Sequence, residues 1–130
     1  GLLTSSLNEA QGYSDVLAGS LVASNPAGLQ RFGMPQEVSD DWNSPTPATA
    51  ETLARTAQKF FDSQVGVGIT GLVAEATEAS GRVGTAHMAF AVGDQVTSRS
   101  GSYPTQRLRI RSRAVTHALL ELMAALNPSN

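Results

Sequence analysis

The residues with the clearest capacity for chemistry are the pair Ser24 and Asn25, which separates an apolar run from a short helical pattern. Asn25 is a favoured N-cap, because its side-chain oxygen can accept a hydrogen bond from an amide of the first turn, and Pro26 suits the first helical position. The free amides and partial positive charge of a helix N-terminus can hold a phosphate or a carboxylate. The pair therefore indicates an anion site, with simple helix capping as the alternative.

A second candidate is a set of arginines at the start of the C-terminal helical pattern. Cations near a helix N-terminus are disfavoured by a few tenths of a kcal/mol to about 1 kcal/mol each. A bound anion or facing carboxylates would compensate for this cost. The cluster therefore indicates either an anion site, with Arg107 and Arg111 as binding residues, or ion pairs within the chain or between subunits. The helical members are Arg107, Arg109, Arg111 and Arg113, and together with Arg99 from the preceding predicted strand they make up five of the nine basic residues.

A glycine-rich run over 64–71 is a third place where a ligand could approach the backbone closely. Its candidate binding residues are Gly68, Thr70 and Gly71, although the glycines lack the spacing of a Walker or dinucleotide fingerprint. His87 and His117 have no acidic partner at metal-ligand spacing, and the chain has no cysteine. We therefore expect no metal site, cofactor, thiol chemistry or disulfide.

The segments that must position these residues alternate between helical and strand patterns. A continuous apolar run predicts a strand covered on both faces, and a Gly-Asp pair at 93–94 predicts a hairpin. In the last helix, one stripe of helical period is expected to be buried, formed by Leu108, Val115, Leu119, Leu122 and Leu126. The pattern predicts helices over 1–11, 26–32, 47–62 and 104–126, strands over 14–24, 64–71, 84–92 and 95–103, and an irregular connection over 36–47.

Length and composition limit the class of protein. The 130 residues suit one domain, 1–130, and the net charge is −2. Acidic charge and few aromatic residues disfavour nucleic acid as a partner. No run approaches the roughly 18 apolar residues needed to span a bilayer, and no signal-peptide pattern opens the chain. We therefore expect a cytoplasmic protein without membrane contact. A first residue of Gly rather than Met suggests that the sequence is shortened at its N-terminus.

Five motifs in order resemble the CinA C-terminal domain family, which is also the nicotinamide-nucleotide amidase family. Residues 18–35 align without a gap with a family run close to GGVVSYSNEAKIELLGVP, and residues 1–3 resemble the end of AES-x-TGG-LLA. Residues 68–71 resemble GIAG, residues 83–85 resemble VGT, and residues 107–114 resemble DREEIRERAA. The resemblance implies a single three-layer α/β/α domain with a mixed sheet.

The resemblance also implies a set of catalytic groups, which this sequence does not retain. Family members of this kind hydrolyse the amide of nicotinamide mononucleotide with a serine nucleophile, supported by a tyrosine and a lysine. The serine would precede Gly1, the tyrosine position holds Ala23, and the lysine position holds Gly28. No catalytic residue is carried over.

Three functions follow as hypotheses. The first is a CinA-like domain without amidase chemistry that binds a phosphate-bearing ligand, such as a pyridine nucleotide, or serves assembly. The second is an amidohydrolase that uses an upstream serine, or Ser24, Thr70 or Thr85, as its nucleophile. The third is a homo-oligomeric interaction domain whose arginine cluster pairs across subunits. The expected ligand-binding residues are Ser24, Asn25, Gly68, Thr70, Gly71, Arg107 and Arg111.

Overall fold

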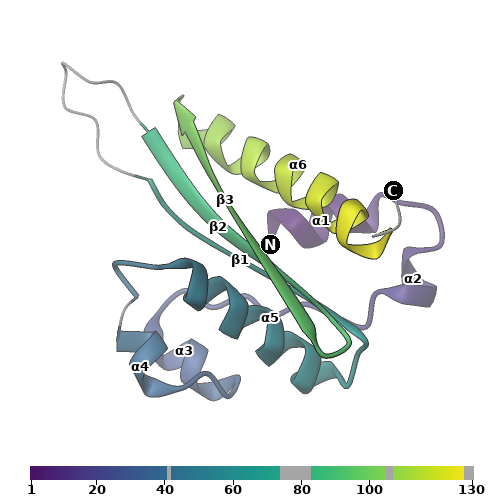
Figure 1. Cartoon of the computed structure of the whole chain (residues 1–130), viewed down its shortest axis with the longest axis horizontal. Coiled ribbons are helices and arrows are strands. Elements are labelled where there is room, and N and C mark those ends of the chain that lie inside the picture. Colours follow the sequence, from purple (N-terminus) through teal and green to yellow (C-terminus); the bar gives the residue numbers. More distant parts are fainter. Residues whose placement is uncertain (41, 74–82, 105–106, 128–130) are drawn as a thin grey trace.

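The computed structural model describes residues 1–40, 42–73, 83–104 and 107–127, with the backbone alone at 72, 73, 83, 104 and 107–109. A sheet lies between helices (Figure 1). The helices are α1 (Leu2–Asn8), α2 (Tyr13–Val16), α3 (Pro26–Arg31), α4 (Gln36–Asp40), α5 (Pro47–Phe61) and α6 (Arg107–Leu126). The strands are β1 (Val65–Val73), β2 (Val83–Val92) and β3 (Gln95–Pro104). No helix in this described part is long and apolar enough to cross a membrane.

The three described strands form one antiparallel sheet in the order β1-β2-β3. Gly68 pairs with Ala89, which pairs in turn with Ser98, so these residues form one row across the sheet. The turn between β2 and β3 passes through Gly93, whose φ of 57° lies in the left-handed region that favours glycine. The hairpin expected from the Gly-Asp pair is confirmed.

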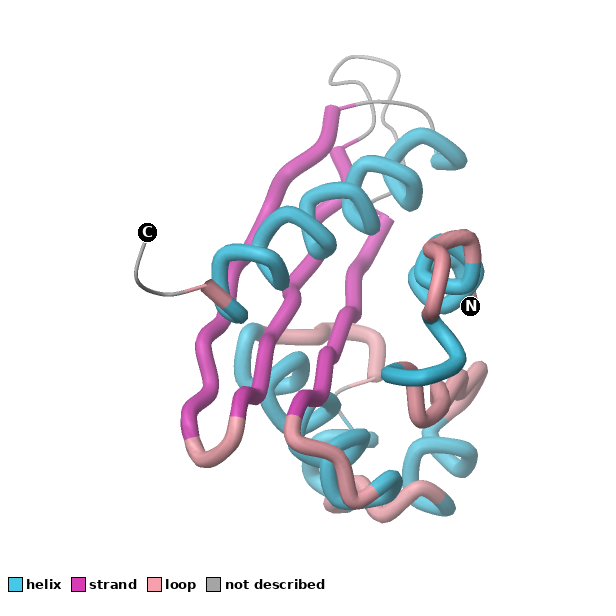
Figure 2. The backbone as a smooth tube through the Cα atoms, turned by 90° about the vertical axis from the view of Figure 1, so that its right-hand side faces the viewer, coloured by secondary structure: helices cyan, strands magenta, loops and turns pink. Residues whose placement is uncertain are grey.

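Helices cover both faces of this sheet. On one face, Gly66 and Gly68 let α5 approach closely, because a Cβ added at Gly68 would lie 2.6 Å from the Ala54 nitrogen. On the other face, α6 packs against Met88 and Phe90. In Figure 2, α6 crosses the near face of the sheet and α1 lies beside the β1 edge. The α/β class and the three layers are confirmed, whereas the described strands pair only antiparallel, not in the expected mixture.

Local sequence signals fix the ends of the helices. Thr46 caps α5 by accepting a hydrogen bond from the Thr49 amide at 3.4 Å, and the Thr49 hydroxyl accepts one from the Thr46 amide at 3.0 Å. This reciprocal pair is a capping box. Asp62 closes the helix with a φ of 49°. The helices expected over 26–32 and 47–62 are confirmed to within one residue at each end.

Two expected segments differ from the structure. Residues 17–23 follow α2 as an extended chain that pairs with none of the described strands, so the strand expected over 14–24 is wrong. The apolar run indicated burial on both faces, yet Val16 is 85% and Val22 59% exposed. A strand requires a hydrogen-bonded neighbour, and none of the described strands pairs with this segment. The connection expected to be irregular over 36–47 contains α4.

The buried face of α6 also differs from the expected leucine stripe. Ile110, Ala114 and Ala118 lie against the sheet and are 4%, 6% and 1% exposed. Leu126, by contrast, is 48% exposed. Small side chains face the sheet because they let the helix backbone lie close to the strands. Of the expected stripe, Val115 is buried and Leu122 packs against the core cluster, whereas Leu126 lies at the margin. The side chain of Leu108 lies outside the described residues.

Candidate functional site

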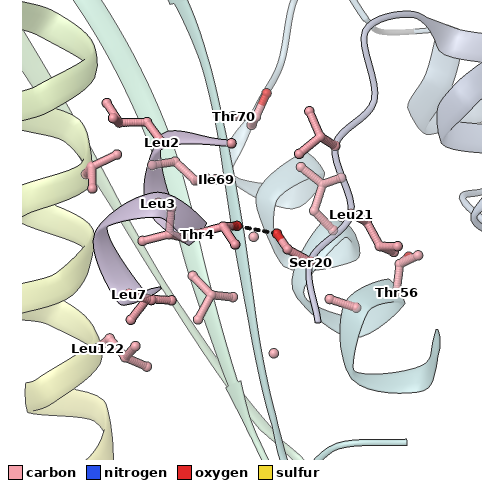
Figure 3. Close-up of a pocket in the computed structure, with 18 of the residues that line it drawn as sticks. Leu2, Leu3, Thr4, Leu7, Ser20, Leu21, Thr56, Ile69, Thr70 and Leu122 are labelled. Carbon is pink, nitrogen blue, oxygen red and sulfur yellow. Dashed lines mark hydrogen bonds between the residues drawn. The ribbon is translucent and has the colours of Figure 1, made fainter. Parts of the chain in front are cut away.

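A cavity of about 1240 Å³ opens between the N-terminal segment, the free edge of β1, and helices α5 and α6. Its walls are mainly apolar: Leu3 and Leu7 of α1 lie near Leu122 of α6, and Leu21 lies on the opposite side (Figure 3). Ile69 of β1 contributes to the floor. The cavity is therefore built from segments that lie far apart in the sequence.

A few polar groups interrupt this apolar lining. The hydroxyls of Thr4 and Ser20 hydrogen-bond to each other across the cavity (Figure 3). Thr70 and Thr85 add hydroxyls from β1 and β2. Arg111 of α6 contributes a guanidinium. Among the described residues of the lining, it is the one charged side chain, and Asp, Glu, Lys and His do not occur there.

The structure brings together four of the residues that the sequence predicts to bind a ligand. Gly68, Thr70, Gly71 and Arg111 all line the cavity. Ser24 and Asn25 are exposed and do not belong to the lining. Arg107 begins α6, and its side chain lies outside the described residues. The glycine-rich strand and one arginine thus share a site that excludes the 24–25 turn.

Asn25 performs the structural role that was the alternative to anion binding. Its side-chain oxygen accepts a hydrogen bond from the Gly28 amide at 2.8 Å and so caps α3. The helix behind it has only six residues. The geometry therefore explains the Ser24–Asn25 signal by capping.

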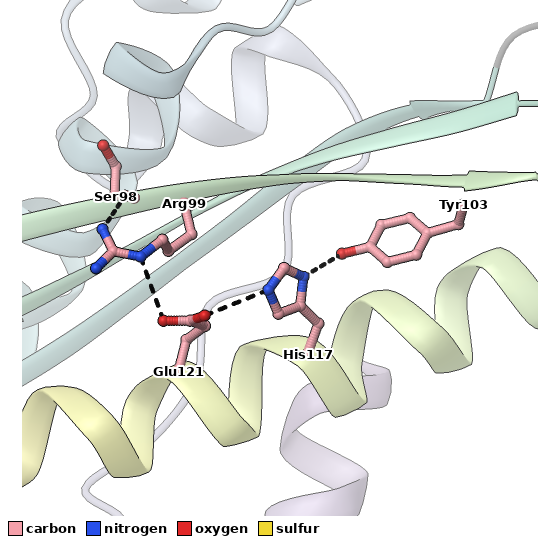
Figure 4. Close-up of polar contacts among 5 residues, drawn as sticks. All are labelled: Ser98, Arg99, Tyr103, His117 and Glu121. Atoms are coloured by element: carbon pink, nitrogen blue, oxygen red, sulfur yellow. Dashed lines mark hydrogen bonds and ion pairs between the residues drawn. The ribbon is translucent and has the colours of Figure 1, made fainter.

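A second polar cluster, which the sequence analysis missed, joins β3 to α6 (Figure 4). The Tyr103 hydroxyl lies 2.6 Å from Nδ1 of His117, and Nε2 of His117 lies 3.5 Å from Glu121. Glu121 also forms an ion pair with Arg99 at 3.3 Å. For Arg99, the structure thus supports the ion-pair alternative. Glu121 stands four residues after His117, so the statement that this histidine has no acidic partner at such spacing is wrong. This i,i+4 spacing is the sequence signal that could have revealed part of the cluster.

Glycine makes room for this cluster. A Cβ added at Gly101 would lie 3.0 Å from Nδ1 of His117 and even closer to the Tyr103 hydroxyl. Burial raises the pKa of Tyr103 above its usual 10.0. The phenol therefore stays protonated at neutral pH and acts as a hydrogen-bonding group rather than as a nucleophile.

These features define a three-layer α/β/α domain with a hollow at the edge of its sheet, bordered by a glycine-rich strand and an arginine-bearing helix. The model of the CinA C-terminal domain family matches residues 1–126, and the chain belongs to this family. The resemblance inferred from the five motifs is confirmed.

Individual relatives agree with this assignment. A CinA-like protein of Mycobacterium sp. strain JLS is 31% identical over 130 residues, covering 97% of this chain and 31% of that protein. The chain thus spans about a third of the length of the curated relatives it matches. Solved structures share the fold: a competence or damage-inducible protein from Enterobacter asburiae (TM-score 0.77, 21% identity, 97% of this chain and 80% of that chain) and a CinA superfamily protein from Enterobacter cloacae (TM-score 0.78, 21% identity, 97% and 76%).

Proposed function

We propose that this CinA C-terminal domain binds a small phosphate-bearing ligand, of the pyridine-nucleotide class, in the cavity beside β1 and does not hydrolyse it. The observation that carries the proposal is the position of Arg111, which lines the cavity together with Thr70 and Gly71. A guanidinium suits a phosphate because it donates charge-assisted hydrogen bonds in a fixed planar arrangement. The apolar walls suit the rings of a nucleotide.

The groups of the lining favour binding over hydrolysis. Cleavage of an amide by a hydroxyl nucleophile requires a neighbouring base that takes its proton. Thr70 and Thr85 offer hydroxyls, but the described lining contains no carboxylate, lysine or histidine. At the position that resembles the family tyrosine, Ala23 presents only a methyl group to the cavity. Gly28, at the lysine position, lies in α3.

Calorimetric titration with nicotinamide mononucleotide, and separately with inorganic phosphate, tests this proposal. We expect the unmodified protein to bind the nucleotide, and Arg111→Gln to weaken binding roughly 10- to 100-fold, since a hydrogen bond to a charged group contributes about 1.5–3 kcal/mol. Arg113→Gln is the matched control, because Arg113 is exposed on the same helix and does not line the cavity. Equal loss in both variants, or no binding by the unmodified protein, would refute the proposal.

The alternative function, amide hydrolysis, has one observation in its favour. Thr70 lies opposite His87 in the pairing of β1 with β2. Nδ1 of His87 is 2.7 Å from the Ser100 hydroxyl. A base thus lies on the strand adjacent to a candidate nucleophile. Ammonia release from nicotinamide mononucleotide that is lost in His87→Gln but kept in His117→Gln would establish the alternative and overturn the binding-only proposal.

Self-association is a third function that the arginines support. Arg111 and Arg113 are exposed on α6, whereas Arg99 pairs within its own chain. An intersubunit contact would therefore use the first turns of α6. Light scattering checks this: a dimer that dissociates in Arg113→Glu supports assembly, and a monomer in the unmodified protein excludes it at the concentration tested.

A further inference from the structure

The outward side of α6 carries two large apolar side chains, Leu120 and Met123, which are 62% and 63% exposed. The inner side of the helix contacts the sheet and α1. Its outward side faces the viewer in Figure 2, where no other described helix or strand crosses it. Thr116 and Asn127, both exposed, border the apolar pair along the helix. Neighbouring apolar side chains with a polar border are typical of an interaction surface.

The charges of α6 are unbalanced along its axis. The first turn has no acidic residue and the last turn has no basic residue, although the opposite arrangement stabilises a helix. Arg113 is exposed in the second turn, and none of the ion pairs between described residues includes it. The helix therefore presents positive charge toward its start and the partial negative charge of its carbonyl groups at its end. A helix that runs in the opposite direction complements this pattern.

The apolar and charged features are symmetric about Leu120. Arg113 lies seven residues before Leu120, and Asn127 lies seven residues after it. Seven residues make nearly two helical turns, so the three side chains point in similar directions at intervals of about 10 Å along the axis. Two antiparallel copies of α6 that meet at Leu120 would thus place Arg113 of each copy beside Asn127 of the other.

We propose that the outward side of α6 binds a second copy of this chain through antiparallel pairing of the two helices. Leu120 and Met123 of both copies form the centre of the contact, where their apolar surface is removed from water. Arg113 of each copy lies at the C-terminal turn of the other helix, where a cation is favourable. Because the same surface is used by both copies, the pair is a closed dimer with two-fold symmetry.

This dimer assigns a surface to the self-association considered above, and it rests on that function. It is independent of ligand binding, because Arg113, Leu120 and Met123 do not line the cavity. The loss of nucleotide binding in Arg111→Gln is therefore measured separately from association, which needs no ligand.

Sedimentation equilibrium without ligand tests the surface. The concentration series should extend to about 1 mM, because the contact of one helix with another is small among specific interfaces. We expect the unmodified protein to dimerise, and Leu120→Glu to weaken dimerisation at least about tenfold, since each dimer would bury two unpaired carboxylates. Val16→Glu is the matched control, because Val16 is 85% exposed on α2.

The outcomes separate the surface from the function. A monomer at every concentration would overturn both self-association and the α6 contact. A dimer that persists unchanged in Leu120→Glu, or that Val16→Glu weakens equally, would overturn the α6 contact alone.

Disulfide crosslinking tests the antiparallel direction. The 130 residues contain no cysteine, so Leu120→Cys alone should link two copies at the symmetry axis. Arg113→Cys alone should not, because the two positions would lie about 20 Å apart along the axis, whereas a disulfide joins Cβ atoms roughly 3.5–4.5 Å apart. A mixture of Arg113→Cys and Asn127→Cys should crosslink between the two variants.

Ser5→Cys, at an exposed position of α1, gives the background of random collisions. Crosslinking of Leu120→Cys no faster than this background would overturn the proposal. Efficient crosslinking of Arg113→Cys with itself, which a parallel pair would give, would overturn it as well.

Discussion

Replacement of Gly68 by alanine tests whether this glycine serves the close contact of β1 with α5. An added Cβ would lie 2.6 Å from the Ala54 nitrogen and 2.8 Å from the Leu53 Cβ, and closer still to the Ala50 carbonyl oxygen. These neighbours belong mostly to the helix backbone, which cannot rotate away. Overpacking of this kind costs about 1–3 kcal/mol, and we expect the upper part of that range.

The opposing effect of this replacement is small. Alanine restricts the unfolded chain more than glycine does, and this raises the free energy of unfolding by about 0.4–1 kcal/mol. We therefore expect Gly68→Ala to lower the free energy of unfolding by about 2 kcal/mol, which corresponds to a fall in Tm on the order of 5–10 °C. Urea unfolding followed by circular dichroism measures the change.

Gly28 provides a matched control of opposite sign. In α3, an added Cβ would lie 3.5 Å from its nearest neighbours, which is ordinary van der Waals contact. Since glycine is about 0.8–1 kcal/mol less favourable than alanine within a helix, Gly28→Ala should leave stability unchanged or raise it slightly. If Gly68→Ala proves as stable as the unmodified protein, α5 does not approach β1 as described.

Three further replacements test individual contacts. Tyr103→Phe removes the hydrogen bond to His117 and should cost about 0.5–1.5 kcal/mol near pH 7. Burial raises the pKa of Tyr103 in the folded state. The stabilising effect of the protonated Tyr103 is therefore present below pH 10 and is lost as the pH rises through the folded-state pKa. Tyr103→Phe should accordingly flatten the fall in the free energy of unfolding at alkaline pH. Thr46→Ala removes the α5 cap and should cost about 1 kcal/mol, whereas Thr52→Ala in the same helix should stay within about 0.5 kcal/mol; thermal unfolding compares the two. Asn25→Ala should cost about 1 kcal/mol through the α3 cap but leave the calorimetric affinity for nicotinamide mononucleotide unchanged, and a large loss of affinity would restore it as a ligand contact.

Local patterns predicted most of the secondary structure. Short-range hydrogen bonds place the ends of several elements. Examples are the Thr46–Pro47 start of α5, the Asn25–Pro26 start of α3 and the Gly93–Asp94 turn between β2 and β3. Such signals are contained within a short window of sequence. The family, and with it the α/β/α layers, followed from motifs in order.

The sequence-based predictions that the structure contradicts share one physical cause: the features concerned depend on contacts with residues that are distant in the sequence. The run over 14–24 has a strand's composition, but strand formation requires a neighbour that the described chain does not provide there. The leucines of α6 follow a helical period, yet Ala114 and Ala118 face the sheet because the helix lies close to it. The network of Tyr103, His117 and Glu121 likewise depends on how β3 and α6 pack.

For the candidate site, the sequence alone predicted the glycine-rich strand and the arginines as ligand-binding candidates, because glycine and arginine have strong individual chemical preferences. Only the tertiary structure decided that Thr70 and Arg111 share one cavity and that Asn25 does not belong to it. The physical reason is that a cap is satisfied within three residues of chain, whereas a cavity is formed by the relative placement of α1, β1 and α6, which depends on packing across the whole sheet.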